Sequence, residues 1–134
     1  LVGRVADGTS TWMTGPMTIR DHVYPTINDA AESAGRPQPQ VITAVPVCIT
    51  EDAAAAKKMA TEYFGFYGEL PSYRAMLDRE GLENSWDIAL IGSFEEVAEG
   101  LQGYVDAGAT QVVATVFGPG DDQQNTISSL SDLL

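Results

Sequence analysis

With 134 residues, 44% of them hydrophobic, the chain is long enough for one domain with a substantial core, and we expect a single domain over residues 1–134. Its formal net charge of −12 at pH 7 makes nucleic acids and anionic membranes poor partners, since contacts to phosphate groups need clustered lysine and arginine. No stretch reaches the roughly 20 apolar residues of a membrane span, and the first residues lack the pattern of a signal peptide, so we expect a cytoplasmic location.

The first predicted element is a short strand that ends at Met13. The turn signal Asp7-Gly8 precedes a run of β-branched and aromatic residues that leads up to this methionine. After a loop, a helix is expected with Thr18 as its N-cap and Gly35 at its end. Pro25 lies inside this helix and lacks the N–H that a helix interior needs, which predicts a kink or a later start.

The second predicted strand covers residues 41–49, a continuous apolar run rich in β-branched side chains. Pro46 makes it an imperfect central strand. Cys48 is the single cysteine, so it forms no internal disulfide, and its apolar surroundings indicate a core residue rather than a nucleophile. His22 is the single histidine and has no second histidine or cysteine to join it, so no metal site is predicted.

Two helices are predicted in the middle of the chain. The first opens at residues 50–52, where polar side chains can cap it, and runs to Phe64. The segment after it, residues 65–70, is rich in glycine and aromatic residues. It is either a wall of a pocket or a corner between helices, and the corner is the simpler interpretation. The second helix spans residues 71–82 and directs three side chains inward: Tyr73, Met76 and Leu77.

The next helix has the clearest start signal of the sequence. Ser93 and Glu96 are three residues apart, as in a capping box, in which each side chain satisfies a free backbone N–H at the helix start. Gly108 is placed to end this helix. The short apolar stretch 86–91 before it is interpreted as an extended lead-in rather than a full strand. One face of the helix is apolar: Phe94, Val97, Ala98, Leu101, Tyr104 and Val105.

The last strand is predicted at residues 112–117. Its apolar residues do not alternate with polar ones, so both faces are expected to be covered, as in a parallel sheet wrapped by helices. A polar loop, residues 118–125, leads to a final helix with four apolar side chains: Ile127, Leu130, Leu133 and Leu134. The repeated change from strand to helix predicts a parallel α/β architecture.

Two loops at the carboxyl ends of predicted strands are the candidate binding regions, residues 12–17 and 118–123. Glycine lets the backbone approach a ligand, and free N–H groups at a following helix suit a phosphate. Glycine and proline also make ordinary turns, which is the alternative interpretation. Asp121 and Asp122 are either an acid/base pair or a solvated loop tip, and the loop tip is favoured. No catalytic triad, phosphate-loop motif or dinucleotide fingerprint is present.

Four stretches together resemble the luciferase-like monooxygenase family, and more closely its actinobacterial branch that uses the deazaflavin coenzyme F-420: residues 1–16, 45–50, 90–99 and 105–110. The resemblance implies a (β/α)8 TIM barrel with parallel strands wrapped by helices. Family members are about twice this length, in keeping with the size of that barrel. This chain resembles their C-terminal part, about strands six to eight.

The resemblance also implies a function. It is that of a coenzyme F-420-dependent oxidoreductase, which transfers a hydride between the cofactor and a small organic substrate. The alternatives are an FMN-dependent monooxygenase of the same family and a non-catalytic half-barrel that assembles with itself. Catalytic residues are not assigned, because the family's reactive site lies mainly on the first strands. We therefore expect the chain to be inactive alone and to need a homodimer or a companion chain over its open barrel edge.

The cofactor contacts implied by the resemblance come from both loops: Trp12, Met13, Thr14, Gly15, Gly118, Gly120 and Gln123. Thr14 and Gly15 match the family stretch near the cofactor phosphate. Gln123 stands in a region where some deazaflavin enzymes have a basic residue, so F-420 and FMN both remain open. Arg20 either replaces that cation or lies on the surface. Candidate substrate contacts, which are otherwise core residues, are Phe64, Phe66 and Tyr67.

Overall fold

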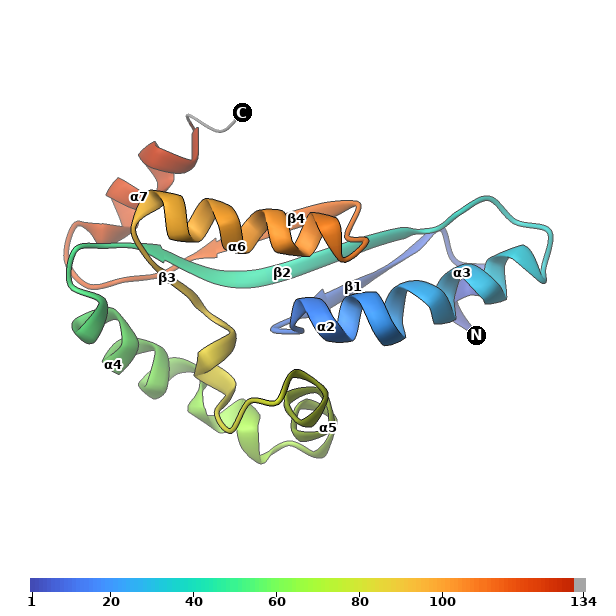
Figure 1. The fold of residues 1–134 in the computed structure, drawn as a ribbon, viewed down its shortest axis with the longest axis horizontal. Helices are drawn as coiled ribbons and strands as arrows, with labels where there is room; N and C mark the ends of the chain where they lie inside the picture. Colours follow the sequence, from blue (N-terminus) through green and yellow to red (C-terminus); the bar gives the residue numbers. More distant parts are fainter. Residues whose placement is uncertain (132–134) are drawn as a thin grey trace.

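The computed structural model describes residues 1–131 and shows parallel strands with helices packed along them (Figure 1). The strands are β1 (Gly8–Trp12), β2 (Gln40–Ile49), β3 (Leu90–Gly92) and β4 (Gln111–Val116). The helices are α1 (Val2–Val5), α2 (Pro16–Thr18), α3 (Tyr24–Glu32), α4 (Ala53–Phe64), α5 (Pro71–Glu80), α6 (Phe94–Asp106) and α7 (Asp122–Ser131), with a π-helical turn η1 (Ile19–Val23) and 3₁₀ turns η2 (Gly65–Glu69) and η3 (Ser85–Ile88). The predicted parallel α/β architecture is confirmed.

The central strand is β2, and every other strand pairs with it in parallel. Residues 42–44 of β2 pair with β1 and β4 at the same time, so these two strands lie on opposite edges. Val47 pairs with both Leu90 of β3 and Val116 of β4, which places β3 on the β1 edge, farther along β2. The full strands are therefore ordered β1, β2, β4, and β3 is a short extension that follows the 3₁₀ turn η3.

Pro46 is tolerated in the central strand because of where its missing donor would point. Met13 N donates to Ala44 O, so the even-numbered residues of β2 turn their backbone groups toward the edge shared by β1 and β3. Pairing with β1 ends at Ala44, and pairing with β3 begins at Val47. Pro46 lies between these two points, so its lack of an N–H removes no inter-strand hydrogen bond.

The first long helical segment begins earlier than the sequence indicated. Gly15 is its N-cap and Pro16 its first residue, a position where proline loses nothing because that N–H has no helical partner. The prediction of Thr18 as N-cap is therefore wrong. Instead of breaking at Pro25, the segment passes through the π-helical turn η1 and resumes as α3 at Tyr24.

The other predicted helix caps are present. Asp52 Oδ1 accepts a hydrogen bond from Ala55 N at 3.0 Å at the start of α4. At the start of α6, Ser93 N donates to Glu96 Oε2 at 2.8 Å and Glu96 N donates to Ser93 Oγ at 3.2 Å, which confirms the capping box. Gly108, with φ of +104°, ends α6 as predicted.

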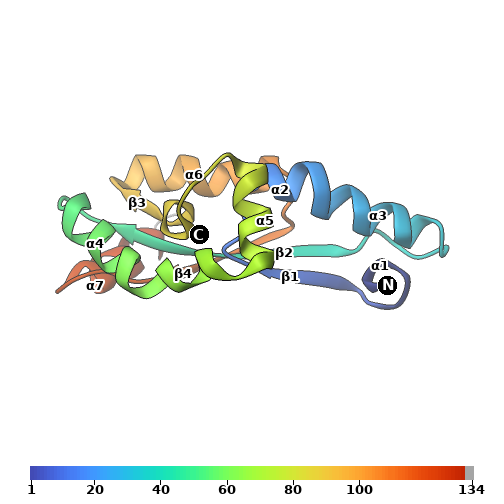
Figure 2. The ribbon, with the colours of Figure 1, turned by 90° about the horizontal axis from the view of Figure 1, so that it is seen from below.

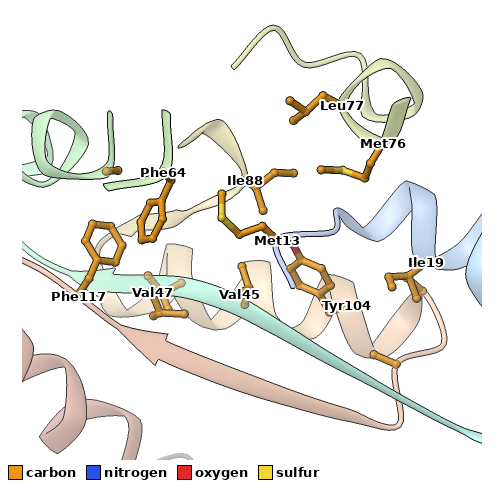
Figure 3. Close-up of a cluster of buried hydrophobic side chains, with 14 of the residues drawn as sticks. Met13, Ile19, Val45, Val47, Phe64, Met76, Leu77, Ile88, Tyr104 and Phe117 are labelled. Carbon is orange, nitrogen blue, oxygen red and sulfur yellow. The ribbon is translucent and has the colours of Figure 1, made fainter. Parts of the chain in front are cut away.

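The core lies mainly between one face of the sheet and the helices along it. Met13 and Val45 are fully buried, and Tyr104 of α6 is 2% exposed beside them (Figure 3). Burial raises the pKa of the Tyr104 phenol well above its ordinary value, and the nearby Glu80 carboxylate adds to the rise. Figure 2 shows α6 and the α2–α3 segment along this face and α7 on the other.

The opposite face of the sheet is only partly covered by the described residues. Trp12, Ala44 and Val113 stand in register across it, and Val113 is 48% exposed. The prediction that both faces of the last strand are covered is therefore wrong. An apolar run shows that a strand suits burial, but the neighbouring elements decide which of its faces is buried.

Helix α7 also turns a different face inward from the one predicted. Thr126 is fully buried, and its Oγ1 accepts a hydrogen bond from Ile49 N at 2.9 Å. Ile127, which was expected to point inward, is 50% exposed. Thr126 is buried in place of Ile127 because its hydroxyl forms a hydrogen bond with a backbone amide at the end of the central strand. The other predicted contacts of this helix include Leu133 and Leu134, which lie outside the described residues.

Candidate functional site

The loops that follow β1 and β4 lie at the same end of the sheet, and one aromatic side chain joins them. The Phe64 ring packs edge-on against Trp12, with centroids 6.2 Å apart, and against Phe117, with centroids 5.3 Å apart. Figure 3 shows the contact between Phe64 and Phe117. Phe64 is 8% exposed, so this candidate substrate contact packs into the core. No local sequence signal marks it as the residue that links the two predicted loops.

Trp12 continues this cluster on its other side. The ring of Tyr67 lies 6.3 Å from Trp12 and 4.8 Å from Tyr73, centroid to centroid. Burial raises the pKa of Tyr73, with a further contribution from Tyr67, so its phenol is neutral at physiological pH. A pocket of about 250 Å³ opens beside Trp12, Thr14 and Tyr73. The third substrate candidate, Phe66, is 65% exposed and lies at the surface.

The loop of residues 13–15, called here the Gly15 loop, is fixed by its first residue. Met13 is the only non-glycine residue with a positive φ, +49°, among residues 1–131. Its N–H donates to Ala44 O at 3.0 Å, and its side chain is fully buried. A left-handed methionine is uncommon and costs roughly 1–3 kcal/mol, so surrounding contacts must hold it. The loop therefore has one well-defined conformation at the end of β1.

Glu80, the last residue of α5, accepts hydrogen bonds from the backbone amides just after this loop. Its Oε2 accepts a hydrogen bond from Met17 N at 3.2 Å, and its Oε1 accepts one from Thr18 N. A side chain at Gly15 would collide with the same carboxyl group. Sequence reasoning missed this residue because more than sixty positions separate it from the loop, and nothing near Glu80 marks it.

The loop of residues 117–121, called here the Gly118 loop, is held by a close approach and a local hydrogen bond. A Cβ at Gly118 would lie 2.8 Å from Cys48 Sγ. Gln123 Nε2 donates to Gly118 O at 3.1 Å, so the amide predicted to contact a cofactor folds back onto its own loop. Gly120 has φ of +54° and open space around it. It makes the turn.

Cys48 beneath this loop is a core residue. Its side chain is fully buried, which confirms the interpretation from sequence. Burial raises the pKa of the Cys48 thiol to about 11, and the nearby Asp122 carboxylate contributes to the rise. A thiol with this pKa is protonated near neutral pH, so it is neither a nucleophile nor a ready metal ligand.

A cleft of about 740 Å³ lies at the carboxyl ends of β2 and β3, and its charged side chains are all acidic: Glu51, Asp52, Glu96 and Asp122. Asp52 and Glu96 cap α4 and α6, so two of the four carboxylates have structural roles. Within residues 1–131, no three histidine, cysteine or acidic side chains are grouped as a metal ion would need. No helix in this part of the chain is long and apolar enough to cross a membrane.

The phosphate of a flavin or deazaflavin fits neither loop as these residues stand. The Met17 and Thr18 amides beside the Gly15 loop are bound to a carboxylate, and the Gln123 amide is bound to its own loop. Arg20, the possible replacement cation, is exposed and donates to Asp21 at 2.7 and 2.8 Å. No cation lines the acidic cleft. The aromatic pocket beside Trp12 suits a ring, and no lysine or arginine lines it.

Comparison with known proteins gives one family. The family profile described as luciferase-like monooxygenase matches residues 1–111. A search of curated proteins found no match.

Among solved structures, a coenzyme F-420-dependent tetrahydromethanopterin reductase from Methanopyrus kandleri superposes with a TM-score of 0.74 at 20% identity, covering 96% of this chain and 44% of its own. An F-420-dependent secondary alcohol dehydrogenase in complex with an F-420–acetone adduct superposes with a TM-score of 0.71 at 15% identity, and the match covers 96% of this chain and 44% of the dehydrogenase. EDTA monooxygenase from Chelativorans sp. BNC1 superposes with a TM-score of 0.64 at 16% identity, and the match covers 98% of this chain and 40% of the monooxygenase. The chain spans less than half the length of these proteins, and the likeness establishes the fold, a partial TIM barrel.

Proposed function

The chain belongs to the luciferase-like monooxygenase family, and from this we propose that it forms the C-terminal part of a flavin- or deazaflavin-dependent oxidoreductase. The complete enzyme would transfer a hydride between the cofactor and a small organic substrate. Coenzyme F-420 is proposed first, because the two F-420-dependent neighbours superpose more closely than the monooxygenase does. FMN is the alternative. A bound cofactor supplies the redox chemistry, and the protein supplies binding and orientation.

The observation that carries the proposal is the junction of the two predicted loops through one aromatic cluster. Phe64 touches both Trp12 and Phe117, so the ends of β1 and β4 form one surface. In parallel barrels, ligands bind at this end of the strands. Trp12 and Tyr73 line the small pocket, and aromatic side chains of this kind favour stacking against a flat ring.

This surface is one wall of a site rather than a complete pocket. The cavity beside Trp12 measures about 250 Å³, which is below the roughly 300–1,000 Å³ of pockets that enclose a ligand. A cofactor ring bound here would be open to solvent on its other side. For this reason the fragment alone is proposed to bind the ring weakly and to lack turnover.

The missing walls are proposed to come from the other strands of the barrel. Among the described strands, only β2 pairs with β1 or β4, so each of these has an unpaired edge, and Val113 of β4 is half-exposed on the face of the sheet. Two copies of this chain would bring six full strands, fewer than the eight of a TIM barrel, and each copy carries a net charge of −12. A segment or companion chain with the remaining strands fits better than a homodimer.

Titration of the chain with coenzyme F-420, FMN and riboflavin tests the proposal by ring absorbance and fluorescence. We expect weak binding of at least one ring by the wild type and a several-fold loss in the Trp12→Ala variant, the scale of one aromatic contact. Tyr63→Ala is the matched control, because Tyr63 is 60% exposed on the neighbouring helix. If no ring binds, the cofactor assignment is wrong and the non-catalytic half-barrel remains. Turnover by a stable monomer would refute the proposed dependence on further strands.

A further inference from the structure

We infer that Glu80 closes the helix start beside the Gly15 loop to phosphate, so that this chain does not hold a cofactor's phosphate at residues 14–18 while Glu80 is in place. The inference rests on the proposed function for its cofactor, although its geometry stands without it. It departs from the role that the family resemblance gives to Thr14 and Gly15. Three observations support it: the hydrogen bonds of Glu80, the lack of space at Gly15 and the way α5 carries the carboxylate.

The hydrogen bonds show that Glu80 takes the place an anion would take. Its two carboxylate oxygens accept from the neighbouring amides of Met17 and Thr18, one oxygen to each amide. These amides belong to the first turn of the helical segment, where backbone N–H groups have no helical acceptor. A phosphate at the same amides would have to displace the carboxylate or lie against it, and two anions in contact repel each other.

The space beside the loop is also filled. A Cβ built on Gly15 meets three atoms of the Glu80 side chain, including its carboxyl carbon. Glycine at this position therefore makes room for Glu80 rather than for a ligand. Gly15 itself has φ of −74° and ψ of 164°, which any residue can adopt, so the need for glycine comes from the contact and not from the backbone.

The carboxylate sits on a well-packed helix. Met76 and Leu77 of α5 are 6% and 0% exposed and belong to the main core. The helix ends directly after Glu80, at Gly81 with φ of +70°. Glu80 is itself only partly exposed. The packed helix therefore fixes the backbone of Glu80 beside the loop, and its carboxylate closes the helix start in this structure.

The side chains around this helix start provide little positive charge to offset the repulsion between Glu80 and a phosphate. Arg20 is close enough for Glu80 to add to the rise of its pKa, but the larger causes are the hydrogen bond and the charge of Asp21. The Arg20 guanidinium donates two hydrogen bonds to that carboxylate. The pair of Arg20 and Asp21 has no net charge, so Glu80 gives this end of the helix an overall negative charge.

The test measures binding of the phosphate group and binding of the flavin ring separately. Amide resonances of Met17 and Thr18 are followed by NMR during titration with inorganic phosphate, and the affinities of FMN and riboflavin are compared in the same proteins. In the wild type we expect no phosphate-dependent shift at these amides and an FMN affinity within about twofold of that for riboflavin. In Glu80→Ala, phosphate should shift both amides, and FMN should gain about five- to tenfold over riboflavin, as expected for an anion at a helix start.

Two further variants control the test. Glu83→Ala removes an exposed carboxylate three positions away and should behave like the wild type. Glu80→Gln keeps a hydrogen-bond acceptor but loses the charge, so it should respond more weakly than Glu80→Ala, and it decides the question if the alanine variant does not fold. A shift at Met17 and Thr18 in the wild type overturns the inference, and so does the lack of one in both Glu80 variants. If neither flavin binds, the FMN alternative fails while the phosphate titration still gives its answer.

Discussion

The loops after β1 and β4 have similar sequences but are held in different ways. The Gly15 loop is fixed by distant parts of the chain. The backbone N–H of Met13 donates to Ala44 O, and the Glu80 carboxylate accepts hydrogen bonds from the two amides that follow Pro16. The Gly118 loop is fixed in part from within, by the hydrogen bond from Gln123 to Gly118. Glycine and proline in a sequence show where the backbone turns. They do not show which contacts hold the turn. Substitutions at three glycines and one glutamine can distinguish a loop held by distant segments from a loop held by local contacts.

Gly118→Ala should have the largest effect. Gly118 has φ of +147°, and an added Cβ would lie 2.8 Å from Cys48 Sγ and 3.0 Å from Asp122 Cβ. Backbone strain and overpacking together should lower the free energy of unfolding by about 3 kcal/mol, measured by urea denaturation. Adding Cys48→Ala removes one of the clashing atoms and should recover part of the loss. If the double variant loses the full sum of the two single effects, contact with Cys48 is not the cause.

Gly15→Ala should cost about 1.5 kcal/mol, because the added methyl group displaces the Glu80 carboxyl group from the Met17 and Thr18 amides, in a backbone conformation that alanine tolerates. Urea denaturation measures this cost in the wild type and in a Glu80→Ala background. In that background the collision is gone, so the same substitution should be nearly neutral. An equal cost in both backgrounds would show that the loop is not held against Glu80.

Gly120→Ala should cost about 1 kcal/mol, the price of placing an alanine at a left-handed position. Nothing lies within 4 Å of the added Cβ, so no clash contributes. Gly120→Asn is the comparison, because asparagine adopts this conformation more readily and should cost less. Thermal denaturation of the two variants checks the order, and an asparagine variant that is less stable than the alanine variant would contradict the conformational explanation.

Gln123→Ala should have the smallest effect, about 0.5 kcal/mol, because it removes one partly buried side-chain hydrogen bond to Gly118 O. Gln124→Ala is the matched control one residue later, at another exposed position, and should leave stability unchanged. Both are measured by urea denaturation under the same conditions. Equal values for the two variants would mean that the local bond does not stabilise the Gly118 loop.

Most elements whose signals are local in sequence were predicted correctly, although the N-cap of the first long helical segment is Gly15 and not Thr18. The capping box of Ser93 and Glu96, the Asp52 cap and the end of α6 at Gly108 each depend on residues within one helical turn. The order of strands and helices follows from hydrophobic patterns of the same short range. The partial barrel was named from a resemblance, and the superposition with solved structures supports it.

What the sequence left undetermined depends on contacts between distant segments. The burial of Thr126 instead of Ile127 follows from a backbone amide of β2, and the exposure of Val113 follows from the lack of a cover over that face. The link through Phe64 and the closure by Glu80 have the same origin. Cofactor and substrate binding by the predicted residues remain predictions, because they depend on molecules outside the chain.

The most direct test of the proposed function is to map by NMR where coenzyme F-420 and FMN contact the chain. We expect shifts at the Trp12 indole and at Thr14 and Tyr67, in and beside the aromatic pocket. Gly35 and Gly108 should be unchanged, because they follow helices near the amino ends of β2 and β4. Shifts confined to that opposite end, or none from either cofactor at concentrations up to the millimolar range, would contradict a cofactor wall formed by the ends of β1 and β4.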